Sequence, residues 1–405
     1  MIPQTLPPED QAGKPKRLLI FLITLVLLLG IQYPILFLIT GLLMHGSVDK
    51  FKARLVARGY TQQEDIDYLE NISPVVKFTT VRLFLCLAAV KHWDLYQLDA
   101  NNAFLNGDLS EEVYMALPSG YTCSNPSLKF HVCMLHKSIY GLKQASRQWN
   151  EKFTTAILNV GFVQSNSDYS LFVRGSGDSL IALLIYGYDM VIAGPKSANI
   201  PALISDLGSI FRLRDLGPLK YFLGMEIARS SSGITVSQRS YTLNLLEEIS
   251  YSESKPVSLT MDQKIRLNIE DGEIISDPFQ YRSLIVKLIY LTHTRPDILF
   301  AVNRLSQFVS KPRTSDLQAT HYLLRFLKAS PGQIIFFSAH SYLSLKGFSD
   351  ADWGSCADTR RSTKGVGIIS IIISAHILEL NVYGYLTDSP IKVINLSYWI
   401  GLYGY

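Results

Sequence analysis

The chain has 405 residues, of which 48% are apolar, and a formal net charge of +4 at pH 7. This length accommodates two or three domains, and the mildly basic balance permits nucleic-acid binding without requiring it. The four cysteines (Cys86, Cys123, Cys133 and Cys356) form no CxxC pair and have no histidine at zinc-ligand spacing. The cysteine pattern therefore excludes a zinc module and a disulfide framework, and indicates reduced thiols in an intracellular protein.

The first distinctive segment is an uncharged apolar run of 27 residues, 18–44. It is long enough to span a bilayer with tilt, it has no signal-peptide cleavage pattern, and basic residues flank it on both sides. One interpretation is a transmembrane helix that associates the protein with a membrane. The alternative is foreign or non-coding sequence translated at the edge of a degraded gene, which we would still expect to adhere to membrane.

The middle of the chain alternates helical and strand patterns, which predicts an α+β fold with mostly antiparallel strands. A helix is expected over Thr80–Ala89, followed by a strand that ends near Asp99. The elements expected next are a helix within Gly141–Val160, strands over 169–194, an amphipathic segment Ile200–Phe211 and a strand Tyr221–Ile227.

The last third of the chain changes character. Residues 237–330 place leucines at helical spacing, and residues 343–372 begin a second α/β unit. From Ile371 the chain becomes apolar and tyrosine-rich, and we expect a non-native tail that exposes apolar surface.

Two segments carry the chemistry. Leu183–Gly194 (LLIYGYDMVIAG) has two apolar runs around Tyr186-Gly187-Tyr188-Asp189, a pattern typical of a buried β-hairpin with a polar turn. Asp99 ends another apolar strand. Two strand-borne carboxylates from distant parts of a chain can together hold divalent metal for phosphoryl transfer.

These segments resemble motifs of the copia-type retrotransposon Pol polyprotein, a reverse transcriptase fused to ribonuclease H. Six blocks, one of which contains Asp99, agree in order with this family between about Gly46 and about Gly367. The blocks are QLDANNAFLNGDL (Gln97–Leu109), YGLKQASRQW (Tyr140–Trp149), FKARLVARGYTQ (Phe51–Gln62), DLGPLKYFLGMEI (Asp215–Ile227), Tyr281–Asp297 and the Asp350–Trp353 block.

The resemblance implies a right-hand polymerase of palm, fingers and thumb, followed by a truncated ribonuclease H-like unit. By this comparison the chain divides into a hydrophobic N-terminal segment, fingers and palm, thumb and connection, a ribonuclease H start and an unrelated tail. The corresponding ranges are 1–45, 46–236, 237–340, 341–370 and 371–405.

The resemblance also implies the catalytic residues. Three aspartates of this family hold two Mg²⁺ ions; Asp99 and Asp189 match two of them, whereas Tyr188 stands at the third position. Tyrosine is neutral at pH 7 and is a poor ligand for a hard cation. We therefore expect a weak or inactive RNA-directed DNA polymerase that retains Asp99 and Asp189 as metal ligands.

Substrate-binding residues follow from the same motifs. Phe104 matches the aromatic that excludes a 2′-hydroxyl, and Lys52 and Arg54 lie where the fingers contact the incoming dNTP. Gly141 and Lys143 match the segment that packs on the templating base pair, Tyr186 belongs to the catalytic hairpin, and Tyr221–Gly224 resembles a hairpin that grips the primer. Judged without the motifs, Phe104 is a core residue, the cations are a solvated face and YFLG is a buried strand; Trp149 is expected in the core.

In the ribonuclease H-like part, Asp350 matches the first of four metal-binding acids, and the blocks that supply the others do not occur. RNA cleavage is therefore not expected. The leading interpretation is a degenerate reverse transcriptase that binds RNA/DNA primer-template and dNTPs, cytoplasmic by family. The alternatives are a non-catalytic nucleic-acid-binding remnant and a membrane-associated protein.

Overall fold

The computed structural model describes residues 21–25, 36–44, 47–116, 132–262, 267–268 and 270–343, with short strands at 346–347, 350–351, 364–365 and 394–395. The chain divides into two compact units. The first unit comprises residues 1–74 and 101–161, and the second comprises residues 75–100 and 162–405. Helices and strands are mixed in both, as the sequence predicts.

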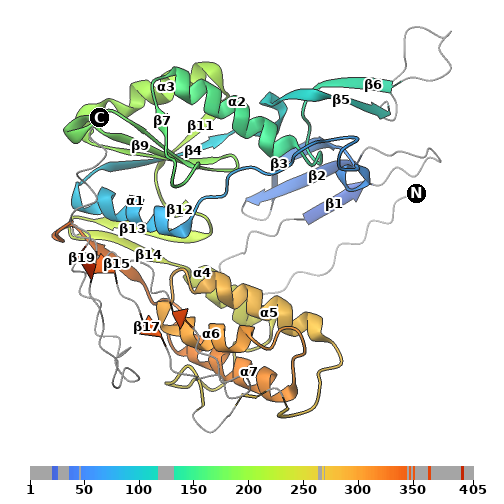
Figure 1. Cartoon of the computed structure of the whole chain (residues 1–405), viewed down its shortest axis with the longest axis vertical. Helices are drawn as coiled ribbons and strands as arrows, with labels where there is room; N and C mark the ends of the chain where they lie inside the picture. Colours follow the sequence, from blue (N-terminus) through green and yellow to red (C-terminus); the bar gives the residue numbers. More distant parts are fainter. Residues whose placement is uncertain are drawn as a thin grey trace. The chain divides into compact units, whose positions relative to one another are not determined.

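The first unit contains a three-stranded antiparallel sheet, a two-stranded hairpin and one long helix (Figure 1). The elements are β1 (Phe21–Leu25), β2 (Leu36–Met44), β3 (Ser47–Val56), η1 (Gly59–Thr61), η2 (Ala103–Asn106), β5 (Asp108–Ala116), β6 (Val132–Lys137) and α2 (Ala145–Asn159).

Of the segment 18–44, for which a transmembrane helix was expected, the structure describes residues 21–25 and 36–44, and these are strands. Its described residues form β1 and β2, which pair with each other, and β2 also pairs with β3. The two described stretches are 5 and 9 residues long, lengths at which an apolar sequence is compatible with either a helix or a strand. Pairing with β3 favours the strand. Within the described residues, no helix is both long and apolar enough to cross a bilayer.

The core of the first unit lies between the hairpin and the start of α2. Val113, Leu142 and Ala145 are buried there, and Phe104 and Leu135 pack against them. On α2, Trp149 and Phe153 are fully buried, with ring centroids 5.4 Å apart. The prediction that Trp149 is a core residue is confirmed.

The second unit is built on a six-stranded antiparallel sheet in the order β11-β4-β10-β9-β8-β7. The central strands β9 and β10 are buried almost along their full length, which matches the apolar runs of the predicted hairpin. The strands are β4 (Asp94–Ala100), β7 (Val163–Gln164), β8 (Leu171–Arg174), β9 (Ile181–Tyr186), β10 (Asp189–Gly194) and β11 (Leu213–Pro218). Helix α3 (Ile200–Ile210) contacts β11 and confirms the predicted amphipathic segment.

Helix α1 (Phe78–Val90) packs between this sheet and a second, four-stranded sheet, as Figure 1 shows. The second sheet has the order β12 (Tyr221–Phe222), β13 (Met225–Ser230), β14 (Gly233–Ser237), β15 (Ile335–Ser338). Tyr221–Ile227 was expected as one strand, but a turn at Leu223–Gly224 divides it into β12 and β13. Positive φ angles at both turn residues end the extended conformation.

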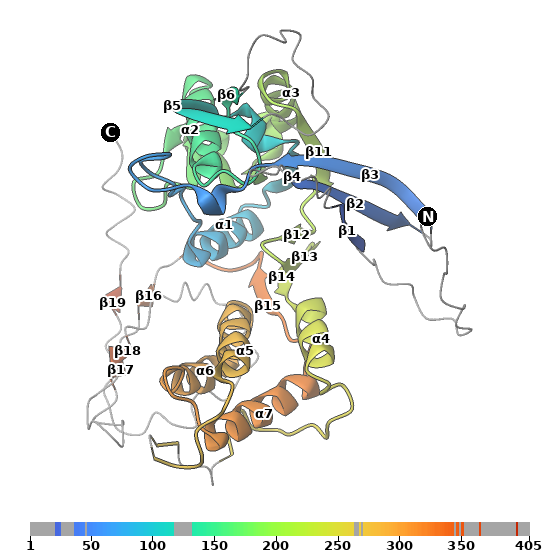
Figure 2. The ribbon, with the colours of Figure 1, turned by 90° about the vertical axis from the view of Figure 1, so that its right-hand side faces the viewer.

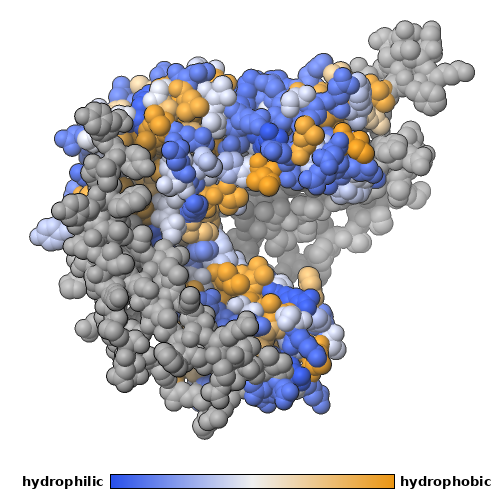
Figure 3. All heavy atoms as spheres, viewed as in Figure 1, coloured by the Kyte–Doolittle hydropathy of each residue, from blue (hydrophilic) through white to orange (hydrophobic). Residues whose placement is uncertain are grey.

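Four helices between β14 and β15 form a bundle with its own core, which confirms the helical pattern of residues 237–330. They are α4 (Arg239–Glu248), α5 (Pro278–Leu291), α6 (Leu299–Ser306) and α7 (Thr314–Ala329). Figure 2 shows β15 running back beside β14 after these helices. Figure 3 shows an apolar patch over α4 and α5. The exposed apolar side chains of these two helices include Leu243, Phe279, Val286 and Ile289.

The part expected to start a ribonuclease H-like unit is described only as short strands. Asp350 lies in β17 (Asp350–Ala351), opposite Gly365 of β18 (Lys364–Gly365). Lys346–Gly347 (β16) pairs with Ile394–Asn395 (β19). Apart from Ile394–Asn395, the expected tail 371–405 lies outside the described residues.

Candidate active site on the six-stranded sheet

Asp99 and Asp189 are far apart in the sequence, and the six-stranded sheet places them next to each other. Asp99 of β4 and Asp189 of β10 are directly opposed in the antiparallel register. Directly opposed residues place their side chains on the same face, with Cβ atoms roughly 4.5–5.5 Å apart. The paired strands therefore present two carboxylates side by side, as the motifs predict.

The surroundings of Asp189 disfavour its ionisation. Burial raises the pKa of the Asp189 carboxyl, and the neighbouring charge of Asp99 raises it further. A carboxyl whose pKa is raised by burial and by a neighbouring carboxylate is typical of sites that receive a proton or a cation.

The turn between β9 and β10 consists of Gly187 and Tyr188. Tyr186 is opposite Asp189 in the register, and Gly187 has a φ of 59°, a conformation that glycine adopts without a steric penalty. The carbonyl of Tyr188 accepts a hydrogen bond from the Ala100 amide at 3.0 Å, which ties the turn to the end of β4. Tyr186 and Tyr188 are 42% and 48% exposed, so both rings reach solvent beside the carboxylates.

One neighbour of the carboxylate pair, Arg214, was not among the site residues predicted from the sequence. Arg214 of β11 is directly opposite Asp99 on the side away from Asp189. The register therefore aligns Arg214, Asp99, Asp189 and Tyr186 across four adjacent strands. The signal in the sequence was the alternation of Arg212 and Arg214 in FRLRDLG, which is typical of a strand with one cationic face.

The donor set does not fit the two-metal arrangement that three carboxylates would hold. Among the residues that the structure describes, no group of three or more His, Cys, Asp or Glu side chains could hold a metal ion. The pair offers two carboxylates, and a phenol stands at the neighbouring position 188.

The pKa of Asp189 leads to a first prediction, on stability. Because the folded-state pKa is raised, the folded protein holds this proton more tightly than the unfolded chain does, and stability falls as pH rises through the ordinary aspartate range. We therefore expect Asp189→Asn to raise the midpoint of thermal unfolding at neutral pH in a metal-free buffer. The gain should disappear in acid, below the ordinary pKa of aspartate.

The matched control is Asp206→Asn, an exposed aspartate on α3. Equal gains from the two substitutions, or a gain that persists in acid, would contradict the proposed origin of the effect.

The predicted substrate-binding residues other than Tyr186 and the Tyr221–Gly224 segment lie in the first unit. Lys143 is already engaged: its Nζ donates to the Gln62 carbonyl at 3.0 Å and to the Tyr68 hydroxyl at 3.3 Å. Its ammonium also lies 5.0 Å from the centroid of the Tyr68 ring. Through these contacts Lys143 connects the region around η1 with the segment before α2.

Arg54, Phe104 and Gly141 gather around Tyr140. The Arg54 guanidinium lies 5.4 Å from the centroid of the Tyr140 ring, and Phe104 meets the same ring edge-on at 5.4 Å. Gly141 has a φ of 90°, and an added Cβ there would overlap the Ala57 carbonyl. The backbones of Gly141 and Ala57 therefore approach closely, between the end of β3 and the segment before α2.

Lys52 lies in β3, opposite Thr40 of β2. Beyond the end of β3, the first unit has a cleft of about 450 Å³. It is bounded by the segment Ala57–Gln62, the β5–β6 hairpin and Leu142, and Arg58, Gln62 and Asp67 supply its polar lining. A volume of this size is in the range of small-molecule pockets.

Comparison with known proteins agrees with the motifs. The family described as "Reverse transcriptase (RNA-dependent DNA polymerase)" matches residues 44–263. The chain is 42% identical over 320 residues to the retrovirus-related Pol polyprotein from transposon RE1 of Arabidopsis thaliana, covering 79% of this chain and 22% of that protein. It is 38% identical over 328 residues to the Pol polyprotein from transposon TNT 1-94 of Nicotiana tabacum, covering 78% and 24%.

A shorter relative is an uncharacterized mitochondrial protein of Arabidopsis thaliana. It is 35% identical over 183 residues, which are 45% of this chain and 76% of that protein. By contrast, the chain spans about a fifth to a quarter of the length of the Pol polyproteins that it matches.

Proposed function

Because this chain belongs to the reverse transcriptase family of copia-type Pol polyproteins, we propose that it is a polymerase domain that binds primer-template and catalyses DNA synthesis weakly or not at all. The opposed pair Asp99 and Asp189 is the observation that carries this proposal. It supports a nucleotidyl-transfer site, since two fixed carboxylates are the core of a two-metal centre.

The weakness of catalysis follows from position 188. The family uses a divalent metal such as Mg²⁺, and the resemblance assigns a third carboxylate to the turn beside Asp189. Tyr188 supplies a neutral phenol instead, which lowers the negative charge that attracts a hard cation. Two carboxylates in place of three do not fit a two-metal centre.

We assign the remaining parts by the same resemblance. Residues 46–236 form fingers and palm, residues 237–340 form thumb and connection, and Asp350 belongs to a ribonuclease H remnant without its acidic partners. Within this scheme, the β12–β13 turn of the second unit is the hairpin that grips the primer.

The second candidate is a non-catalytic protein that retains only nucleic-acid binding. The cationic side chains of the first unit and its cleft, lined by Arg58, favour this reading because phosphate contacts need no metal. Metal-dependent extension of a DNA primer on an RNA template distinguishes the two candidates, since only a polymerase incorporates nucleotide.

Both candidates predict salt-sensitive, sequence-independent binding of primer-template. We expect the Lys52→Ala, Arg54→Ala double variant to weaken this binding and to reduce the slope of log affinity against log salt by about two, because each substitution leaves one phosphate without its cation. Fluorescence anisotropy of a labelled primer-template over a salt series measures the slope.

The control is a Lys91→Ala, Lys196→Ala double variant, which removes the same number of positive charges from lysines outside the first unit. A salt-independent affinity of the unaltered chain, or equal slopes for the two double variants, would rule out the proposed phosphate binding by Lys52 and Arg54.

A further inference from the structure

Tyr290 of α5 is bonded to the β12–β13 turn. Its hydroxyl donates a hydrogen bond to the carbonyl of Leu223, the first residue of the turn. Leu223 and Gly224 have φ angles of 51° and 68°, in the left-handed region that a leucine rarely adopts. An added Cβ on Gly224 would overlap the Tyr290 hydroxyl. Leu223 is thus in an unfavourable backbone conformation, and the turn packs closely against the Tyr290 hydroxyl.

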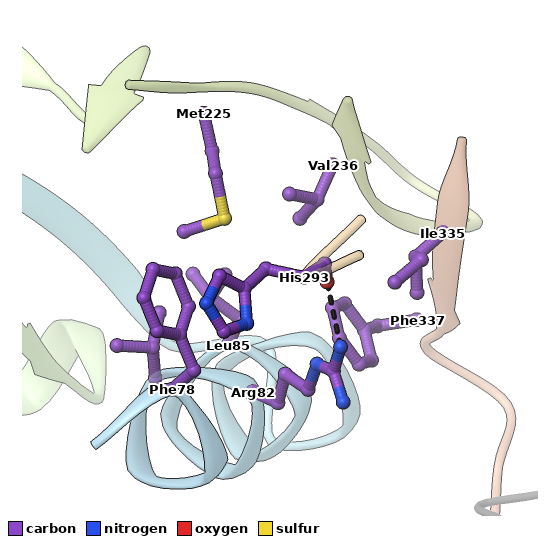
Figure 4. A pocket seen from close by; sticks show the side chains of 9 residues that line it. Phe78, Arg82, Leu85, Met225, Val236, His293, Ile335 and Phe337 are labelled. Atoms are coloured by element: carbon purple, nitrogen blue, oxygen red, sulfur yellow. Dashed lines mark hydrogen bonds between the residues drawn. The ribbon is translucent and has the colours of Figure 1, made fainter. Parts of the chain in front are cut away.

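The end of α5 that carries Tyr290 is itself fixed on α1. Arg82 of α1 donates a hydrogen bond to the carbonyl of His293 at 2.6 Å, and the His293 ring stacks on Phe78 with centroids 3.4 Å apart (Figure 4). The Tyr290 ring also meets Phe78 edge-on at 6.4 Å. Since α1 packs in the core against the six-stranded sheet, its contacts give Tyr290 a defined position relative to that sheet.

Tyr290 is also near the hairpin that carries Asp189. Burial raises the pKa of the Tyr290 hydroxyl, the amide of Gln238 lowers it, and the hydroxyl of Tyr186 raises it again. Electrostatic effects between such groups fall off with distance, so the Tyr186 side chain is within electrostatic range of the Tyr290 hydroxyl. Tyr290 therefore contacts the β12–β13 turn directly and senses the β9–β10 hairpin electrostatically.

We propose that Tyr290 is a positioning residue, which sets the β12–β13 turn relative to the Tyr186–Asp189 hairpin and thereby places the 3′ end of a bound primer. This inference rests on the proposed function, since it assumes that the turn contacts the primer. Tyr290 touches the backbone of the turn and not the reacting atoms, so its effect is on where the primer end lies.

The test is Tyr290→Phe in the full chain, with a fluorescent adenine analogue placed either at the primer 3′ terminus or in the middle of the duplex. The substitution keeps the ring and removes the hydroxyl, with its bond to Leu223 and its interaction with Gln238. We expect an unchanged signal from the internal probe and a shift of about fivefold in the equilibrium between held and free primer ends, the factor that one ordinary hydrogen bond contributes.

The matched control is Tyr241→Phe. Tyr241 packs edge-on against Tyr290 with centroids 4.9 Å apart, but its hydroxyl donates to the Lys287 carbonyl within the helical bundle. It should lower stability comparably without moving the terminal probe. Gly224→Ala, which places a methyl group against the Tyr290 hydroxyl, should reproduce the terminal shift from the other side of the contact.

The outcomes are distinguishable. Absence of primer-template binding by the unaltered chain would overturn the proposed function, and this inference with it. Binding with no terminal shift in Tyr290→Phe and Gly224→Ala would overturn this inference alone. So would equal movement of both probes, or an equal terminal shift in Tyr241→Phe, because those results indicate a general loss of structure.

Discussion

Tyr188→Asp should increase Mg²⁺-dependent primer extension on an RNA template by about a thousandfold over an unaltered chain whose extension is negligible. Loss of a direct metal ligand commonly costs several kcal/mol of transition-state stabilisation, which corresponds to about that factor in rate. The substitution adds a third carboxylate at the turn beside the opposed pair Asp99 and Asp189. Single-turnover extension of a labelled primer measures the gain.

Two controls make this test specific. Tyr188→Asn has a side chain of similar size to aspartate without its charge, and it should give no comparable gain. Asp99→Ala in the Tyr188→Asp background should remove the gain, because the new carboxylate acts only together with the opposed pair. Robust extension by the unaltered chain that Asp99→Ala abolishes would show that the site works with tyrosine, and our explanation of its weakness would be wrong.

Asp297→Ala should destabilise the protein by about 3–5 kcal/mol, the range measured when one partner of a buried ion pair is removed. Arg295 and Asp297 form a pair with side chains 2% and 7% exposed, joined by an Nη2–Oδ2 contact of 2.7 Å. The guanidinium also donates to the carbonyl of Ser330 at 2.7 Å. Without Asp297 the Arg295 charge would remain buried, with only neutral acceptors left among these partners.

Urea unfolding followed by circular dichroism gives the free energy of unfolding for this comparison. The control is Glu248→Ala, which breaks the pair with Lys287, where the side chains are 61% and 30% exposed. A pair of this kind contributes about 0–1 kcal/mol. Similar losses from the two substitutions would contradict a special role for the buried pair, which lies in the Tyr281–Asp297 block.

The hairpin that carries Asp189 could be predicted from the sequence because its determinants are local. Two apolar runs that must be buried enclose a glycine-containing turn, and strands β9 and β10 follow these runs. Helix α1 and the helices between residues 237 and 330 were predictable for the same reason, since helical periodicity is a property of neighbouring residues. The pairing of Asp99 with Asp189 was predictable only through the family motifs.

Other features depend on partners that are distant in sequence. The apolar segment 18–44 was compatible with a helix, and pairing with β3 made its described residues strands. The contacts of the Lys143 ammonium with the Gln62 carbonyl and the Tyr68 hydroxyl join residues about 75 to 81 positions apart in the sequence. A side chain finds such partners only when the chain is folded.

The sequence by itself thus determined the family, the β9–β10 hairpin, the main helices, and the two carboxylates with the tyrosine beside them, because each depends on residue types at short spacing. The tertiary structure decided that Arg214 stands opposite Asp99 and that Tyr290 holds the Leu223–Gly224 turn. Strand register and long-range hydrogen bonds are set by the packing of whole elements against one another. No local pattern in either partner specifies them.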